Sequence, residues 1–424
     1  MRRAVFVSLG IFSWALVWCA RDKTPLGPAE GPAVCPQQEI PWPSLANSPW
    51  PMYRHDPQFT GRSQYIGPRK GRIKWTFQPD AGGIIWPAVV IGPDSTIYFS
   101  THREITPEGG QEPFFYAVTP RGTLKWKYHL ASQASDGSAM LLADGSILVP
   151  CLSSWLILNP DGSLRRNLQV RSPSQPNIGL DGTLYLVDRH DALCAVTQEG
   201  TFKWTLRIDD GFSWQGVALS PDGTSLYGFT FVQPSGPGSS IFHAALCAVG
   251  VDGSLRWRFA LPESTQIPMG LLPMVDCSGA TYFGIGLLSQ SLASQFCSVA
   301  PSGKLNWSVE AFYSWWETPA IDSHGNLYFY DAWWGQRLLS VDCRGCLRWW
   351  HALSDELYAG AVCDAEDVVY VPEGKLLALD RDGSLLWSVP LVGSFSRIAA
   401  PAIGANGILY LGTYGVDSRL YAIE

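Results

Sequence analysis

The sequence predicts an all-β protein, an eight-bladed β-propeller of four-stranded antiparallel blades that is closed by pairing of its N- and C-terminal strands. Three observations lead to this prediction. A pentapeptide of the Gly-x-Leu-x-Trp type occurs eight times, a turn followed by a short apolar strand occurs eight times, and the repeat region begins and ends partway through one unit. Units of about 40–45 residues that each form one small sheet are typical of propellers.

The pentapeptide marks the last strand of each unit. An eighth copy, GSLRR, ends at Arg166 instead of tryptophan. Alternation along a strand directs the side chain of the fifth residue inward, and where that residue is tryptophan its indole buries a large area against a neighbouring blade. We therefore predict a blade-docking role for the seven tryptophans that end the other copies: Trp75, Trp126, Trp204, Trp257, Trp307, Trp349 and Trp387.

The turns set the period and the closure of the ring. Most contain Asp-Gly or a similar pair between apolar strands, which favours hairpins because glycine and asparagine tolerate positive φ. The region opens on a fourth strand at Trp75 and ends on the third-strand sequence LYAIE at Glu424, so one blade is shared between the two ends. Successive turns start 37 to 56 residues apart, at residues 94, 144, 181, 222, 278, 324, 366 and 406.

Composition excludes one class of partner. Charged residues make up 16% of the chain and the net charge is −7, with no run of lysine or arginine that could follow a phosphate backbone. We therefore expect no nucleic-acid partner.

The N-terminus predicts export. Arg2 and Arg3 precede an apolar stretch that ends at Trp18, which has the charge and length of a signal-peptide core. Cys19 is a candidate lipidation site and the only expected link to a membrane, although Trp18 is not the small residue that a lipoprotein signal needs; cleavage after small residues such as Ala15 is the alternative. We expect residues 1–19 to be a signal peptide, 20–70 a proline-rich tether and lead-in, and 71–424 the propeller. The mature protein is then periplasmic, outer-membrane-associated or at the cell surface.

The cysteines divide into two groups. Cys194, Cys247 and Cys297 occupy one slot in the third strands, where a small apolar side chain packs well. Cys343 and Cys346 flank a tight turn and are close enough for a disulfide in an oxidising compartment. We expect no metal site, because no second cysteine pair has the spacing that zinc needs.

The repeats resemble the pyrroloquinoline-quinone-like propeller family, which includes quinoprotein dehydrogenases and BamB-like envelope assembly lipoproteins. The resemblance covers residues 71–424 and implies the propeller fold and the docking role of the tryptophans. The quinoprotein enzymes place adjacent cysteines over the quinone and a carboxylate and asparagine set around calcium. No two cysteines are adjacent here, so we expect no quinone cofactor, no catalytic residues and no enzymatic activity.

One face of the ring is the candidate binding face. The longer insertions, residues 101–114, 231–243, 285–295 and 331–336, follow second strands and emerge on the same face, where binding residues usually lie. Aromatic side chains and one carboxylate gather there, and they form either a partner face or a core plug at the ring entrance. These candidates are Trp86, Trp214, Trp315, Trp316, Glu317, Trp333, Trp334 and Tyr358.

Three functions remain open. The leading hypothesis is a non-enzymatic extracytoplasmic scaffold that binds an envelope protein through this face. The second is a quinone- or sugar-active enzyme that uses Glu317, Asp136 and Arg397. The third is glycan recognition without turnover, by stacking on Trp86 or Trp214.

Overall fold

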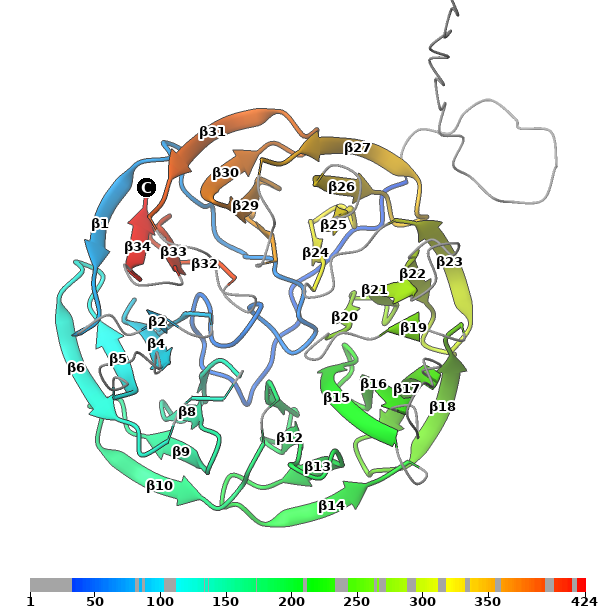
Figure 1. The fold of residues 1–424 in the computed structure, drawn as a ribbon, viewed down its shortest axis with the longest axis horizontal. Coiled ribbons are helices and arrows are strands. Elements are labelled where there is room, and N and C mark those ends of the chain that lie inside the picture. Colours follow the sequence, from blue (N-terminus) through cyan, green and yellow to red (C-terminus); the bar gives the residue numbers. More distant parts are fainter. Residues whose placement is uncertain are drawn as a thin grey trace, which may run out of the picture.

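A computed structural model of the chain shows eight antiparallel sheets arranged radially around a central axis, which confirms the eight-bladed propeller (Figure 1). The structure describes residues 33–80, 84–85, 88–102, 112–132, 134–135, 137–172, 174–208, 212–232, 243–262, 265–266, 272–287, 295–311, 318–331, 336–354, 360–392, 400–413 and 418–424. No helix in these ranges is long and apolar enough to cross a membrane.

Each blade runs from an innermost strand to an outermost strand in chain order, except that the outermost strand of the eighth blade is the N-terminal strand of the chain. The first four blades are formed by β2 (Ile84–Ile85), β3 (Val90–Ile91), β4 (Ile97–His102), β5 (Phe114–Val118) and β6 (Leu124–His129); β7 (Met140–Leu141), β8 (Ile147–Pro150), β9 (Trp155–Leu158) and β10 (Leu164–Leu168); β11 (Asn177–Ile178), β12 (Leu184–Val187), β13 (Leu193–Val196) and β14 (Phe202–Leu206); and β15 (Phe212–Leu219), β16 (Ser225–Val232), β17 (His243–Gly250) and β18 (Leu255–Ala260).

The last four blades follow the same order. They are formed by β19 (Thr265–Gln266), β20 (Met274–Val275), β21 (Thr281–Leu287), β22 (Gln295–Val299) and β23 (Leu305–Glu310); β24 (Ala320–Ile321), β25 (Leu327–Asp331), β26 (Arg337–Val341) and β27 (Leu347–Ala352); β28 (Val362–Cys363), β29 (Val369–Glu373), β30 (Lys375–Leu379) and β31 (Leu385–Pro390); and β32 (Ala402–Ile403), β33 (Leu409–Gly412), β34 (Leu420–Ile423) and β1 (Ile73–Phe77).

The eighth blade closes the ring. Its outermost strand is β1, which pairs antiparallel with the C-terminal strand β34, with Trp75 opposite Ala422. This pairing covers strand edges that would otherwise be exposed, and it confirms the blade that the sequence divides between the two ends.

A glycine and a β-bulge begin every outermost strand. In the turn before β6, Gly122 has φ +82°, and the register then shifts between Leu124 and Trp126. The same shift recurs in all eight blades. Because the bulge lies between leucine and tryptophan, leucine is exposed while tryptophan turns toward the next blade.

The tryptophans lie at the seams between blades. The Trp257 indole in β18 rests on Gly303 of the fifth blade, and its Nε1–H donates to the Pro301 carbonyl at 2.8 Å. Equivalent pairs are Trp75 on Gly122, Trp126 on Gly162, Trp204 on Gly253, Trp307 on Gly345, Trp349 on Gly383 and Trp387 on Gly71. At the remaining seam, Arg166 replaces tryptophan and lies 3.8 Å from the Glu199 carboxylate.

Substituting a seam glycine tests how tightly the indole packs. A Cβ at Gly303 would lie 2.8 Å from the Trp257 indole, whereas a Cβ at Gly200, beside the seam without tryptophan, would lie 3.5 Å from its nearest atom. The φ angle is +80° at Gly303 and +90° at Gly200. Both alanine variants bear the cost of a left-handed backbone, of about 1–2 kcal/mol. We expect Gly303→Ala to lower the free energy of unfolding by about 1–2 kcal/mol more than Gly200→Ala, measured by urea denaturation. Equal losses would mean that the Trp257 indole moves away from the added methyl group without an energetic cost.

The slot that Cys194, Cys247 and Cys297 share in the third strands is part of the core, as predicted. The three side chains are buried, and burial raises the pKa of the Cys194 thiol to about 11 and that of the Cys297 thiol to about 12. Neutral thiols of this kind pack as small apolar groups.

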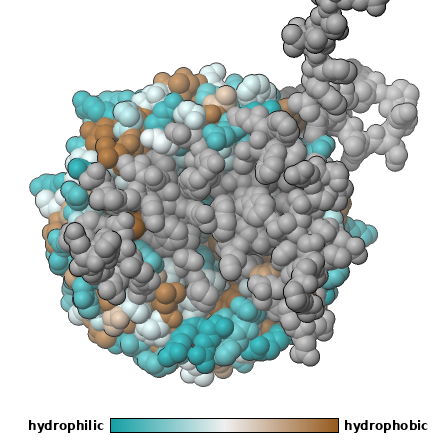
Figure 2. Space-filling model, in the orientation of Figure 1, coloured by the Kyte–Doolittle hydropathy of each residue, from teal (hydrophilic) through white to brown (hydrophobic). Residues whose placement is uncertain are grey.

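On the outer surface, hydrophilic residues gather at the lower edge of the disc in Figure 2, where Figure 1 places β10 and β14.

Candidate functional site

Residues 42–63 cross the centre of the ring (Figure 1). The last residue of the innermost strand donates its backbone N–H to a carbonyl of this central segment in six blades. A seventh blade contributes the Asn177 side chain, which donates to the Pro57 carbonyl at 2.8 Å. The six donors, with their acceptors, are Ile91 to Trp50, Leu141 to Pro51, Leu219 to Pro57, Val275 to Gln58, Ile321 to Thr60 and Cys363 to Gly61, at 2.8–3.2 Å.

These contacts place the central segment at one mouth of the ring. Each donor strand ends directly before the tight turn to its second strand, so the segment lies at the tight-turn face and the long insertions belong to the opposite face. Trp50 and Phe59 are fully buried. Arg54 is also buried, and its guanidinium donates to the carbonyls of Pro319 and Ala361, both at 2.5 Å. Residues 42–63, which fall within the predicted proline-rich tether and lead-in of residues 20–70, therefore belong to the propeller core.

His55 of the central segment carries a shifted pKa. Burial alone would lower the pKa of the imidazole, but its hydrogen bond with Asp56 and the negative charge of Glu39 outweigh burial, and the pKa lies above the ordinary value of 6.5. The ring also packs edge-on against Trp50, with 5.1 Å between centroids. Protonated His55 thus stabilises the docked segment.

This shift predicts a pH-dependent stability. A raised folded-state pKa gives stabilisation that is complete below the unfolded pKa and is lost as the pH rises through the folded pKa. We expect the stability difference between the wild type and His55→Gln to shrink as the pH rises from about 6 to about 9, measured by urea midpoints. A difference that grows with pH would contradict a raised pKa.

The N-terminal end of this region is covalently attached to the ring. Cys35 forms a disulfide with Cys343, with 6.2 Å between their Cα atoms. The predicted Cys343–Cys346 disulfide is therefore wrong, and Cys346 is not disulfide-bonded. The sequence spacing suggested a local pair, but the tight turn that starts at Asp342 presents Cys343 to a segment that lies 308 residues earlier in the chain.

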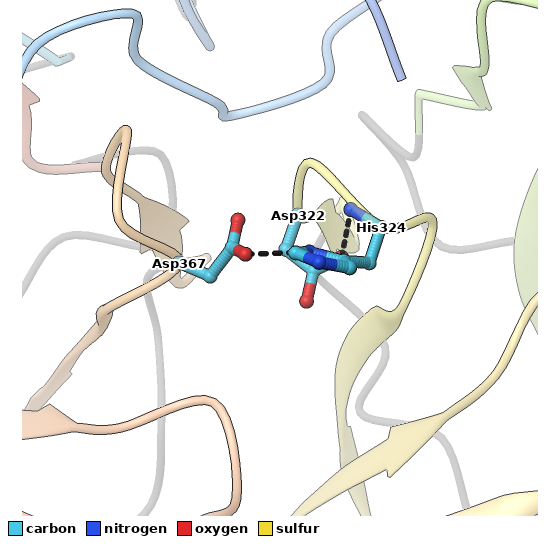
Figure 3. Close-up of side chains that lie close together, drawn as sticks. All are labelled: Asp322, His324 and Asp367. Carbon is cyan, nitrogen blue, oxygen red and sulfur yellow. Dashed lines mark hydrogen bonds and ion pairs between the residues drawn. The ribbon is translucent and has the colours of Figure 1, made fainter. Parts of the chain in front are cut away.

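Asp322, His324 and Asp367 form the one group in the described ranges whose ligand atoms could converge on a metal ion (Figure 3). His324 Nδ1 lies 2.7 Å from Asp367 Oδ2, and Arg381 donates to His324 Nε2 at 3.1 Å. The Tyr328 hydroxyl donates to Asp322 Oδ2 at 2.8 Å. The candidate ligand atoms are thus already engaged by one another and by protein donors.

This group anchors the N-terminal segment instead. The backbone N–H of Cys35 donates to the carbonyl of His324 at 2.8 Å, and that of Gln37 donates to the carbonyl of Ser323. Gly325 leaves room for the close approach, since a Cβ there would lie 2.5 Å from the Cys35 carbonyl oxygen. Sequence reasoning found no metal-spaced histidine pair and did not predict this group.

The structure places one of the predicted face residues. Trp214 in β15 is buried, with 2% of its surface exposed, so it belongs to the core, and its predicted role in an exposed face is corrected. The other members lie outside the described residues: Trp86, Trp315, Trp316, Glu317, Trp333, Trp334 and Tyr358, as do Asp136, Arg397 and Cys19.

A crevice opens on the outer side of the ring, at the seam between β23 of the fifth blade and the sixth blade. It has a volume of about 70 Å³, and Asp331, Arg337 and Trp350 line it. The sequence contained a signal for it, because Trp349-Trp350 is a tandem where the other blades have at most one tryptophan. We did not predict a site there.

The closed ring and its internal segment define the class of this protein as a β-propeller of eight blades. No family model and no curated protein matches the sequence. Among solved structures, BamB from Moraxella catarrhalis shares 13% identity and a TM-score of 0.51 over 84% of this chain and 99% of its own. The Dos1 propeller is 9% identical in sequence and superimposes with a TM-score of 0.57; the match covers 87% of this chain and 96% of the Dos1 propeller chain. These similarities support the β-propeller fold.

Proposed function

We propose that this protein is a non-enzymatic extracytoplasmic scaffold that binds an envelope protein through the face that carries the long insertions. The observation that carries the proposal is the central segment, which is hydrogen-bonded to seven blades and closes the tight-turn mouth. A closed ring fixes the strand ends from which the insertions emerge, and binding residues are usually on loops that a rigid scaffold carries. The BamB-like fold favours a protein partner in envelope assembly.

The Cys35–Cys343 disulfide supports an extracytoplasmic location. Disulfides persist in oxidising compartments and are rare in the cytosol, and this one joins two distant parts of the chain. Export to the periplasm, the outer membrane or the cell surface follows as part of the proposal, with Cys19 as the candidate lipid anchor.

Affinity capture from envelope extracts tests the binding face. The double variant Trp315→Ala/Trp316→Ala is compared with Phe202→Ala, which truncates an aromatic ring that is 48% exposed on the outer strand β14. We expect a defined partner to bind the wild type and Phe202→Ala equally and the double variant at least about tenfold more weakly. Equal binding by all three proteins would argue against the insertion-bearing face.

The non-enzymatic part of the proposal has its own test. An absorption spectrum of the purified protein and assays of quinone- or sugar-dependent turnover check for chemistry. A bound quinone chromophore, or turnover that disappears in Glu317→Ala, would contradict it.

A further inference from the structure

The crevice at the seam between the fifth and sixth blades is bordered by a small side chain, Val309 of β23. The residue at this position, two after the seam tryptophan, varies between blades: it is phenylalanine or tyrosine in three of them, as at Phe259 in β18, and valine in β23 and β31. The apolar walls of the crevice include Val309, Phe329 and Leu339.

Its inner end carries an acceptor and a donor that have no hydrogen-bond partner among the residues that the structure describes. The Asp331 side chain is 3% exposed, and its Oδ2 accepts from Arg337 Nη2 at 2.5 Å. The other carboxylate oxygen, Oδ1, and the Arg337 Nε–H are buried and make no hydrogen bond within the described part of the chain. An unsatisfied buried polar atom costs about 1–3 kcal/mol, so both atoms favour an occupant.

The next seam shows what such a carboxylate binds. In the seventh blade, Glu373 and Lys375 take the register positions of Asp331 and Arg337. The Glu373 side chain is as deeply buried as that of Asp331. Its carboxylate accepts a hydrogen bond from the backbone N–H of Ser354 at 2.6 Å and lies 3.4 Å from Lys375 Nζ. At this equivalent position the partner is therefore an amide N–H.

We propose that the crevice binds a glutamine or asparagine side chain of a partner protein. The carboxamide N–H donates to Asp331 Oδ1, the carboxamide oxygen accepts from Arg337 Nε–H, and the methylene groups lie against Val309 and Leu339. The volume of about 70 Å³ is enough for a small polar group such as a carboxamide.

Charge selects against the alternatives. A carboxylate would satisfy Arg337 but meet the negative charges of Asp331 and Glu310, which also line the crevice. An ammonium would satisfy Asp331 but leave Arg337 Nε unpaired beside a second positive charge. Trp350, 53% exposed at the opening with the Arg337 guanidinium 5.6 Å from its ring centroid, adds aromatic contact area for a partner.

Fragment binding tests the pocket without any partner. Propionamide, propylamine and propionate are titrated into the full-length protein while the NMR signal of the Trp350 indole N–H, assigned with Trp350→Phe, is followed. We expect saturable shifts with propionamide, with a Kd on the order of millimolar, and at least about tenfold weaker effects with the two ions. Val309→Phe should abolish the shifts, whereas Leu206→Phe, which introduces the same ring at the equivalent position of β14, should retain them.

The partner assignment rests on the proposed function and has a separate measurement. The partner captured through the insertion-bearing face should bind Val309→Phe at least about tenfold more weakly than Leu206→Phe, with both variants melting like the wild type. Propionamide that shifts Trp350 no more than the ions do would overturn the pocket, whatever the capture experiment gives. Selective propionamide binding with unchanged partner affinity for Val309→Phe would overturn the partner assignment alone.

Discussion

Replacement of Trp50 by alanine is expected to lower the free energy of unfolding by about 3–5 kcal/mol, the range typical of a fully buried tryptophan. Trp50 has no exposed surface, lies at the centre of the ring and accepts the backbone hydrogen bond of Ile91. Its indole packs against His55, so its loss leaves a cavity where the central segment meets the innermost strands. Guanidinium chloride denaturation followed by circular dichroism measures the change.

Trp350→Ala is the matched control for this prediction. It removes the same side chain from a position that is 53% exposed, and we expect a loss below about 1 kcal/mol. If Trp50→Ala were no more destabilising than Trp350→Ala, the central segment would not be part of the folded core. Exposure of the segment should also make the Trp50→Ala protein more sensitive to proteolysis between residues 33 and 70.

The blade count and the ring closure could be predicted because they depend on local sequence. Each glycine turn determines a hairpin within a few residues, and eight copies make an error in one unit unimportant. The exposed leucine of the pentapeptide could not be derived from alternation. Leu124 and Trp126 are two residues apart and would share a face in a regular strand, but the bulge between them separates them.

The central segment and the disulfide were missed for a different reason. Proline-rich stretches without periodicity are read as linkers, and nothing local shows that the carbonyls around Pro57 meet strand ends hundreds of residues away. The pairing of Cys35 with Cys343 is equally non-local. Spacing favours neighbouring cysteines, but the choice depends on which side of the turn faces another segment.

The predicted binding face also shows that the sequence determines local structure but not the contacts between distant segments. The sequence could not decide whether Trp214 lies on an exposed face or in a core plug, and its burial within β15 decides for the core. The crevice depends on the combination of a small seam residue, Val309, with two buried polar atoms that have no partner among the described residues. Such differences between repeats become visible only when the repeats are superimposed in space.

Truncation of Trp257 to alanine is expected to lower the free energy of unfolding by about 2–3 kcal/mol, less than for a fully buried ring because this indole is only half-buried. The variant loses the contact with Gly303, the tilted packing against Tyr227 and the hydrogen bond to the Pro301 carbonyl. Thermal unfolding measures the effect, and an unchanged melting temperature would contradict a role in blade docking.

Arg166→Trp makes the reverse change at the seam that lacks an indole. Space exists over Gly200, where a Cβ would find no atom closer than 3.5 Å, and the Arg166–Glu199 ion pair that is lost is exposed and contributes little. We therefore expect this variant to be as stable as the wild type or slightly more stable. A loss as large as that of Trp257→Ala would show that this seam has a geometry of its own, because the other seams accept an indole over the same glycine.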